Sequence, residues 1–208
     1  MDDKLKQILE TASRLFMRFG LRSVTMDDLA REAGVSKKTL YVHFKDKNDL
    51  VYQVFQFFME DHVQCINALC KEKGNAIDQW YAMVYQIVQD LGEIHPTLLY
   101  DMRKYHPDVW KMFNEHRNEV MLQMVTDNLR LGIKEGLYRE DMDVDIIARL
   151  YINIFPLMME GEIFPRTRFP FLKVHHEIFL YNTLAVSSEK GRKHLLDHYK
   201  TPLSPRIQ

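Results

Sequence analysis

The chain has 208 residues, of which 46% are hydrophobic and 27% are charged, and its formal net charge at pH 7 is -1. These proportions are typical of a globular protein and exclude an intrinsically disordered or fibrous chain. No uninterrupted apolar run reaches the roughly 20 residues of a membrane-spanning helix, and the N-terminus lacks the pattern of a signal peptide. We therefore expect a cytoplasmic protein that does not contact a membrane.

The first helix is predicted over residues 5–19, where apolar residues recur at three- and four-residue steps and a glycine, Gly20, follows as a C-terminal stop. Thr25 and Asp28 then have the spacing of a capping box, in which the hydroxyl accepts an early backbone N–H and the acid reaches back. A second, short helix is therefore expected over residues 26–33.

Ser36 is expected to cap a third helix over residues 37–44, and Asp46 a long fourth helix over residues 47–71. Helical periodicity continues to the end of the sequence, so we predict an all-α fold. The remaining helices are expected at residues 76–93, 96–105, 107–135, 145–160, 172–187 and 189–199.

Prolines and aspartates refine these helix ends. Pro96 and Pro107 are expected at first-turn positions, where the missing N–H costs nothing. Pro156 is expected to kink its helix, and either Asp143 or Asp145 to cap it. The two prolines within residues 161–170 predict a loop there.

The charges are unevenly distributed along the chain. Residues 1–50 carry ten Lys and Arg against eight Asp and Glu, a net charge of +2 that leaves -3 for the rest. Four lysines lie within eleven residues of this segment, at Lys37, Lys38, Lys45 and Lys47. The excess is too small to identify a nucleic-acid binder on its own, and such a cluster also fits a solvated surface.

Residues 26–44 have the pattern of two short helices that cross at a steep angle. Ala30 supplies the small residue where they cross, and Gly34 supplies the glycine of the tight turn. Five further residues supply the apolar contacts between the helices: Leu29, Ala33, Val35, Leu40 and Phe44. Some helical hairpins are purely structural, but one with exposed lysines on its second helix favours a helix-turn-helix that binds DNA.

In a helix-turn-helix the second helix enters the major groove and neighbouring groups bind phosphates. Lys37 and Lys38 can reach guanine O6 and N7, and Val42 can pack on a thymine methyl group. Ser36, at the start of this helix, joins them in the candidate DNA-binding set. The phosphate contacts are expected from side chains that donate hydrogen bonds: Thr25, Thr39, Tyr41, His43 and Lys47.

Three of the phosphate candidates also have a structural alternative that is compatible with DNA contact. Thr25 fits a purely capping role, the ring of Tyr41 fits a core position, and His43 fits the end of a helix.

At these residues the chain resembles the TetR family of transcriptional repressors. The resemblance covers roughly residues 5–51 and rests on Gly34-Val35-Ser36, Leu40-Tyr41-Val42-His43-Phe44, Lys47 and Leu50. It implies the phosphate and base contacts given above. It also implies an all-helical remainder that dimerises through its last two long helices, here about residues 145–160 and 172–187.

We therefore expect two domains. Residues 1–50 would form the helix-turn-helix DNA-binding domain with the start of the fourth helix, and residues 51–208 the effector-binding and dimerisation domain. A homodimer would bind a palindromic double-stranded DNA operator. A small apolar or aromatic effector would release it by a population shift.

The effector pocket is expected between the fourth helix and those that follow. Its candidate residues are aromatic or Met side chains, which suit an apolar ligand but equally suit a plain core: Trp80, Tyr85, Tyr100, Trp110, Phe113, Met121, Met124, Phe155 and Met158.

Other classes of protein find less support. No HExxH, P-loop, GxSxG or dinucleotide-binding pattern is present, so we expect neither an enzyme nor a cofactor. The spacings of His95, Asp101, His106 and His116 fit no compact metal site, and Cys65 and Cys70 fit neither a CxxC pair nor a zinc site. A ligand-independent or architectural DNA-binding protein, and an activator, remain alternatives.

Overall fold

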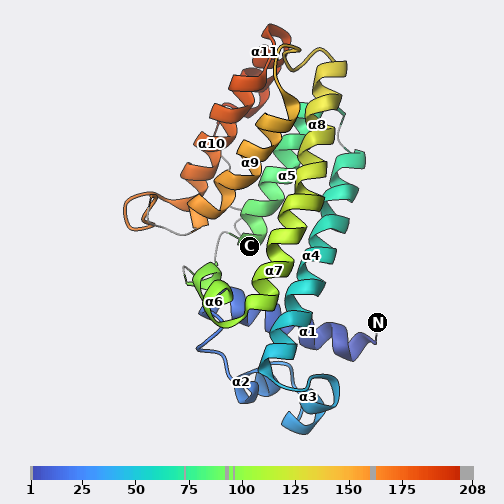
Figure 1. Ribbon diagram of the computed structural model, residues 1–208, viewed down its shortest axis with the longest axis vertical. Helices are drawn as coiled ribbons and strands as arrows, with labels where there is room; N and C mark the ends of the chain where they lie inside the picture. The colour runs from blue at the N-terminus through green and yellow to red at the C-terminus, as the bar shows by residue number, and fades with distance from the viewer. Residues whose placement is uncertain (1, 73, 92–93, 96, 160–162, 202–208) are drawn as a thin grey trace. The chain divides into compact units, whose positions relative to one another are not determined.

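The computed structural model describes residues 2–72, 74–91, 94–95, 97–159 and 163–201, and its regular elements there are all helical. The all-α prediction is therefore confirmed. In chain order (Figure 1) the elements are α1 (Asp3–Phe19), α2 (Met26–Glu32), α3 (Lys37–His43), α4 (Lys47–Glu72), α5 (Ala76–Leu91), α6 (Leu98–Tyr105), α7 (Pro107–His116), the π-helical segment η1 (Arg117–Met121), α8 (Leu122–Lys134), α9 (Val144–Met159), α10 (Phe171–Val186) and α11 (Glu189–Tyr199). No helix in these ranges is long and apolar enough to cross a membrane.

The chain divides into two compact units. Unit 1 contains Met1–Gln64 and Glu93–Glu115, and unit 2 contains Cys65–Gly92 and His116–Gln208. The helix α4 contributes residues to both. The functional boundary after residue 50 is a different kind of division and stays a prediction.

Helix starts in unit 1 follow the predicted caps. The Thr25 hydroxyl accepts the backbone N–H of Asp28 at 3.2 Å, and the Asp28 carboxylate accepts that of Thr25 at 3.1 Å, which completes the capping box. These side-chain and backbone hydrogen bonds from Thr25 lower the pKa of Asp28 to about 2. Ser36 Oγ accepts the N–H of Thr39 at 3.0 Å, and Asp46 Oδ1 accepts that of Asp49 at 2.9 Å.

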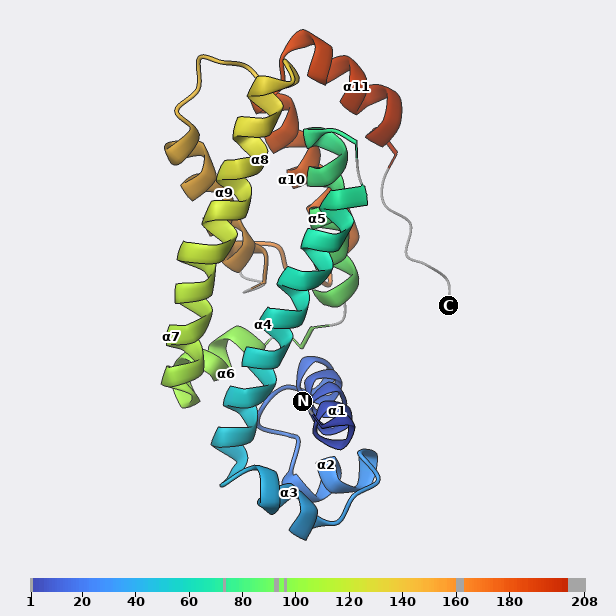
Figure 2. The ribbon, with the colours of Figure 1, turned by 90° about the vertical axis from the view of Figure 1, so that its right-hand side faces the viewer.

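Unit 2 is built around α5, α8, α9 and α10 (Figure 2). Its core takes large apolar side chains from each of these helices, including Ile77, Trp80, Leu129, Ile152 and Phe179. Edge-to-face packing between Trp80 and Tyr151, with ring centroids 4.2 Å apart, joins α5 to α9. Burial of this apolar area supplies most of the free energy that holds the four helices together.

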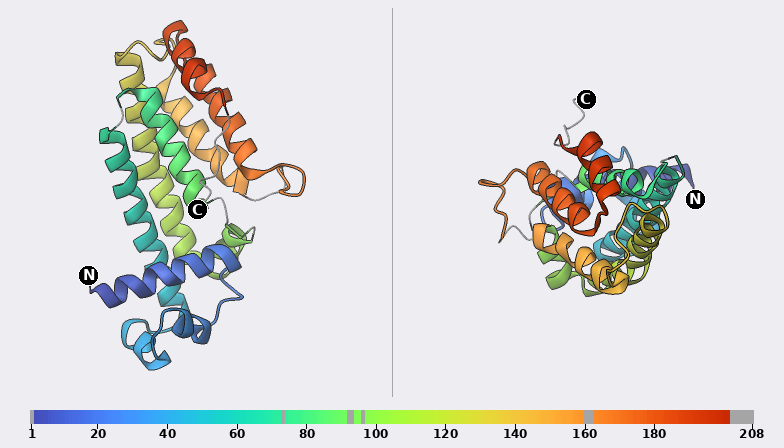
Figure 3. Two further views of the ribbon diagram at one scale, coloured as in Figure 1. Left: turned by 180° about the vertical axis from the view of Figure 1, so that it is seen from behind. Right: turned by 90° about the horizontal axis from the view of Figure 1, so that it is seen from above.

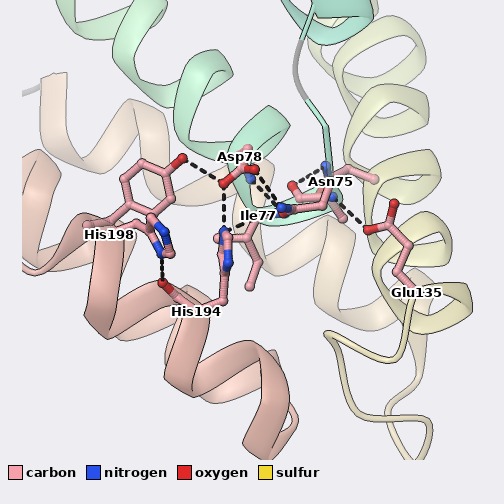
Figure 4. Close-up of polar contacts among 9 residues, drawn as sticks. Asn75, Ile77, Asp78, Glu135, His194 and His198 are labelled. Carbon is pink, nitrogen blue, oxygen red and sulfur yellow. Dashed lines mark hydrogen bonds and ion pairs between the residues drawn. The ribbon is translucent and has the colours of Figure 1, made fainter.

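The last helix, α11, drawn in red in Figure 3, is joined to the first turn of α5 by the polar contacts that Figure 4 shows. Tyr199 donates its hydroxyl proton to Asp78 Oδ1 at 2.7 Å, and His194 Nε2 lies 2.8 Å from the same oxygen. Asn75 donates to the second oxygen at 2.5 Å. Burial raises the pKa of Asp78, but the hydrogen bonds from His194 and Tyr199 outweigh it and hold the pKa below its usual range.

A glycine allows α11 to pack closely on the turn after α8. A Cβ atom on Gly191 would lie only 1.9 Å from the backbone oxygen of Leu137. That neighbour is a backbone atom and cannot rotate away. A side chain at position 191 therefore forces α11 to move away from the turn that contains Leu137.

Two consecutive residues of α10, His175 and His176, are buried histidines. His175 is only 4% exposed, its ring packs on that of Phe171 with centroids 4.3 Å apart, and its Nε2 has no hydrogen-bond partner among the described residues. Burial, and then the positive charge of Arg166, lower the pKa of His175 to about 4. His175 is therefore neutral in the folded protein at pH 7.

The prediction of one uninterrupted α-helix over residues 107–135 is wrong in the middle of that range. Its middle is a π-helical segment, Arg117–Met121, between α7 and α8. A π turn inserts an extra residue into a helical turn, and this segment contains neither Gly nor Pro to mark it. A 3.6-residue apolar pattern therefore did not predict it.

The remaining helix ends differ by a few residues. Asp143, not Asp145, is the cap of α9, because its Oδ1 accepts the N–H of Ile146 at 3.1 Å while Asp145 pairs with Arg149. Pro107 begins α7 as predicted and Pro156 lies inside α9. Pro96 lies outside the described residues.

We predict that Gly191→Ala destabilises unit 2 by about 2 kcal/mol or more, because the added methyl group overpacks a backbone contact. Gly74→Ala is the matched control, since the nearest atom to its Cβ would be 4.0 Å away. Thermal unfolding of the three proteins measures the effect. Equal melting temperatures for the wild type and Gly191→Ala would contradict the packing.

We also predict a loss of stability on acidification that depends on His175. Because its folded pKa of about 4 lies below the ordinary 6.5, the unfolded chain binds the proton first as the pH falls. Stability is therefore lost between about pH 6.5 and pH 4, by at most about 3 kcal/mol. Urea unfolding across this range should show a smaller loss in His175→Gln, while His198→Gln, changed at an exposed position, should behave like the wild type.

Candidate nucleic-acid interface

The α2–α3 pair is a compact helical hairpin within unit 1 (Figure 1). Gly34 turns the chain with a φ of 64°, a value that favours glycine, and the N–H of Val35 donates to the carbonyl of Ala30 at 2.9 Å. Leu29 of α2 and Leu40 of α3 are buried. These contacts fix the direction in which α3 presents its other side chains.

One face of α3 is buried and the opposite face is exposed. Leu40 and Phe44, four residues apart, are almost fully buried, whereas Tyr41 is 49% and Val42 74% exposed. The lysines that precede them, at positions 37 and 38, are also exposed. Residues four apart share a helix face, so these side chains form one outward surface of basic and apolar groups.

The predicted phosphate contacts lie around this surface. Thr25 and Thr39 occupy the starts of α2 and α3, and the Thr39 hydroxyl is 2.8 Å from that of Ser36. The exposed ring of Tyr41 shows that it does not fill a core position. His43 is half-buried at the end of α3.

Lys47 begins α4 and is half-buried. Burial lowers the pKa of its ammonium group, while the negative charge of the buried Asp101 acts in the opposite direction. Thr97 donates to Asp101 at 3.1 Å, so this carboxylate is held in place.

An ion pair across the hairpin was not predicted from the sequence. Lys37 Nζ lies 3.0 Å from Asp27 Oδ1 and 3.1 Å from Oδ2. The two residues are ten apart in sequence and lie on different helices, so no helical spacing rule connects them. Only the packing of α2 on α3 brings them together.

The nine predicted effector-pocket residues fall into both units. Tyr100, Trp110 and Phe113 belong to unit 1, where the last two stack with centroids 5.6 Å apart. The other six belong to unit 2: Trp80, Tyr85, Met121, Met124, Phe155 and Met158. Their role in ligand binding stays a prediction.

Unit 2 contains a cavity of about 70 Å³ between α5, α8, α9 and α10. Of the nine predicted residues only Trp80 lines it. Polar residues that the prediction missed contribute to its wall, among them Asn128, Tyr138 and Thr183. The Asn128 amide donates to the carbonyl of Ala76 at 2.9 Å. Asn128 of α8 and Thr183 of α10 are isolated polar residues on otherwise apolar helix faces, and they were the available sequence signal.

The four residues considered as metal ligands do not form a metal site in the part of the chain that the structure describes. Among the described residues, no group of three or more His, Cys, Asp or Glu side chains has the geometry of a metal site. Two of the candidates, His95 and Asp101, are linked by hydrogen bonds through the hydroxyl of Thr97.

Known proteins resemble this chain over most of its length. The model of the family "Bacterial regulatory proteins, tetR family" matches residues 8–54. The HTH-type transcriptional regulator YhgD of Bacillus subtilis is 39% identical over 169 residues, which cover 73% of this chain and 82% of that protein. The HTH-type transcriptional repressor KstR2 of Mycobacterium tuberculosis is 25% identical over 150 residues, which cover 69% of this chain and 73% of that protein.

A solved structure shows the same fold. The transcriptional regulator FadR of Bacillus subtilis, in complex with stearoyl-CoA, superposes with a TM-score of 0.68 at 18% identity, over 88% of this chain and 99% of that one. The exposed basic face of α3, the family model that covers it and the similarity to YhgD agree with one another. This chain belongs to the TetR family of bacterial regulatory proteins, and it is a DNA-binding transcriptional regulator.

Proposed function

We propose that the chain is a homodimeric repressor that places α3 of each copy in the major groove of a palindromic operator and that a small-molecule effector releases it. The observation that carries the proposal is the division of α3 into a buried face and an exposed face of lysines, Tyr41 and Val42. A helix of this kind fits the major groove, which is about 12 Å wide.

The roles of the side chains follow from their chemistry. Lys37, Lys38 and Val42 contact base edges, and Ser36 holds the N-terminus of α3 in position. The phosphate contacts fix the register on the duplex and come from Thr25, Thr39, Tyr41, His43 and Lys47. This division assigns specificity to α3 and much of the affinity to residues around it.

Dimerisation through α9 and α10 is supported by their exposed apolar side chains. Leu150 of α9 is 60% exposed and Tyr181 of α10 is 75% exposed, and Ile146 is also exposed. Large apolar groups gathered on a surface are typical of a protein interface. A twofold axis at this face gives two copies of α3, as a palindrome with half-sites about 34 Å apart requires.

The effector is proposed to be apolar. KstR2 is described as a ketosteroid transcriptional regulator, and FadR was solved with stearoyl-CoA. The cavity of about 70 Å³ is smaller than the 300–1,000 Å³ of typical ligand pockets, so an effector of that size that binds at this cavity would enlarge it. Binding to the enlarged state would shift the population away from the DNA-binding conformation.

We further propose that the chain has no catalytic activity and uses no cofactor. The support is that its relatives are described as transcriptional regulators and that the sequence carries none of the common catalytic motifs.

Substitution of the DNA contacts tests the interface. Lys47→Ala should weaken binding both to a duplex that the wild-type protein selects from a random pool and to unrelated duplexes. The negative slope of log K against log salt concentration should become less steep by about 0.9, because one phosphate contact is lost. Tyr41→Ala should weaken binding to all duplexes as well. Lys71→Ala, at the far end of α4, is the control. Unchanged affinity in Lys47→Ala and Tyr41→Ala together would contradict the interface.

Leu150→Asp tests the dimer. A carboxylate buried at an apolar interface without a partner is costly, so sedimentation should show a monomer with at least tenfold weaker operator binding. Phe19→Asp introduces the same charge at an exposed apolar position of unit 1 and should leave the dimer intact. A Leu150→Asp dimer as tight as the wild type would exclude this face.

A further inference from the structure

The Asp27–Lys37 ion pair lies where the hairpin meets DNA in the proposed complex. Asp27 is the second residue of α2 and Lys37 the first residue of α3. The ammonium group contacts both carboxylate oxygens, at 3.0 and 3.1 Å, while both side chains remain about half or more exposed. The pair is therefore formed but accessible.

The neighbouring aspartate, Asp28, has other partners. Its carboxylate forms the capping box with Thr25 and an ion pair with Arg31 at 2.7 Å. Of the two carboxylates at the start of α2, Asp27 is thus the one directed at α3. The hydrogen bond and the negative charge of Asp27 raise the pKa of Lys37 above its ordinary value.

The carboxylate of Asp27 is unfavourable beside DNA unless it finds a hydrogen-bond donor. Phosphates surround the major groove, so a carboxylate that enters it adds negative charge to a negative environment. If Lys37 left Asp27 to contact a base, the carboxylate would lose its partner at the same moment. A base pair that offers both a donor and an acceptor removes this cost.

A G·C pair offers this combination in the major groove. Guanine N7 and O6 are adjacent acceptors, and the cytosine N4 amino group is a donor beside them. An ammonium group fits the two acceptors, and a carboxylate fits the amino group. In an A·T pair the adenine N6 amino group separates the two acceptors, so the ammonium group meets only one.

We propose that Asp27 and Lys37 act as one unit that recognises a single G·C base pair in each half-site, with Lys37 on the guanine and Asp27 on the cytosine. This inference rests on the proposed binding of α3 in the major groove. It makes Asp27, an acidic residue of α2, a determinant of sequence specificity.

A purely structural role is the alternative. A cation at a helix N-terminus is disfavoured by the helix dipole, and Asp27 offsets that effect for Lys37 at the start of α3. This role changes stability but does not change which base pair is preferred. Sequence preference is therefore the measurement that separates the two.

Selection of duplexes from a random pool, followed by sequencing, tests the proposal with the wild type, Asp27→Ala, Lys37→Ala and Glu32→Ala. Glu32 is the exposed last residue of α2, so its substitution removes the same charge from the same helix. We expect the wild type to select a G·C pair at one symmetric position. Both Asp27→Ala and Lys37→Ala should reduce that preference about fivefold or more at the same position, and Glu32→Ala should retain it.

The proposal is overturned if the two variants relax different positions, or if Asp27→Ala keeps the G·C preference and only strengthens binding to all duplexes, as Glu32→Ala would. Should Asp27→Ala bind poorly to every duplex, Asp27→Leu, which keeps a similar shape but has no acceptor for the cytosine amino group, must relax the same position.

If the wild type selects no sequence, the proposed function fails together with this inference. In the selected site, 7-deazaguanine should weaken wild-type binding but have little effect on Lys37→Ala.

Discussion

The proposed DNA-binding surface depends on the burial of Leu40 and Phe44. A seven-residue helix such as α3 has little stability in isolation, so its position comes from these two side chains packed within the hairpin. Their burial fixes the rotation of the helix about its axis and turns Lys37, Tyr41 and Val42 outward together. The basic side chains alone would not define a binding surface, because long, solvated side chains on a mobile segment have no fixed geometry.

In unit 2, the position of α11 depends on one close backbone contact and one cluster of polar contacts. Gly191 lets α11 approach the backbone at Leu137, and the contacts of Asp78 with His194 and Tyr199 hold the same helix to α5. The cavity beside Trp80 is small. In the proposed function, a ligand larger than this cavity acts by shifting the population toward a conformation with more room.

Local sequence signals predicted much of the fold. The capping box at Thr25, the cap at Ser36 and the helix after residue 188 are determined by neighbours in sequence, and the structure confirms them. The outward face of α3 also follows from a short apolar pattern. The positions of the candidate DNA contacts on that face were predictable because they lie on one short helix.

Features that depend on tertiary packing were not predictable. The π-helical segment after His116 has no proline or glycine to mark it, and the Asp27–Lys37 pair joins two helices at no regular spacing. The lining of the cavity combines α5 with helices more than forty residues further along the chain, so aromatic composition alone identified only Trp80. Side chains that meet across helices require the packing to be known first.

Hydroxyl-radical footprinting of the wild-type protein on a selected operator tests the central claim most directly. Two α3 helices related by a twofold axis should protect two patches on one side of the duplex, with centres about 34 Å, or one helical turn, apart. A single patch, or protection spread evenly along the duplex, would contradict the symmetric binding of two copies.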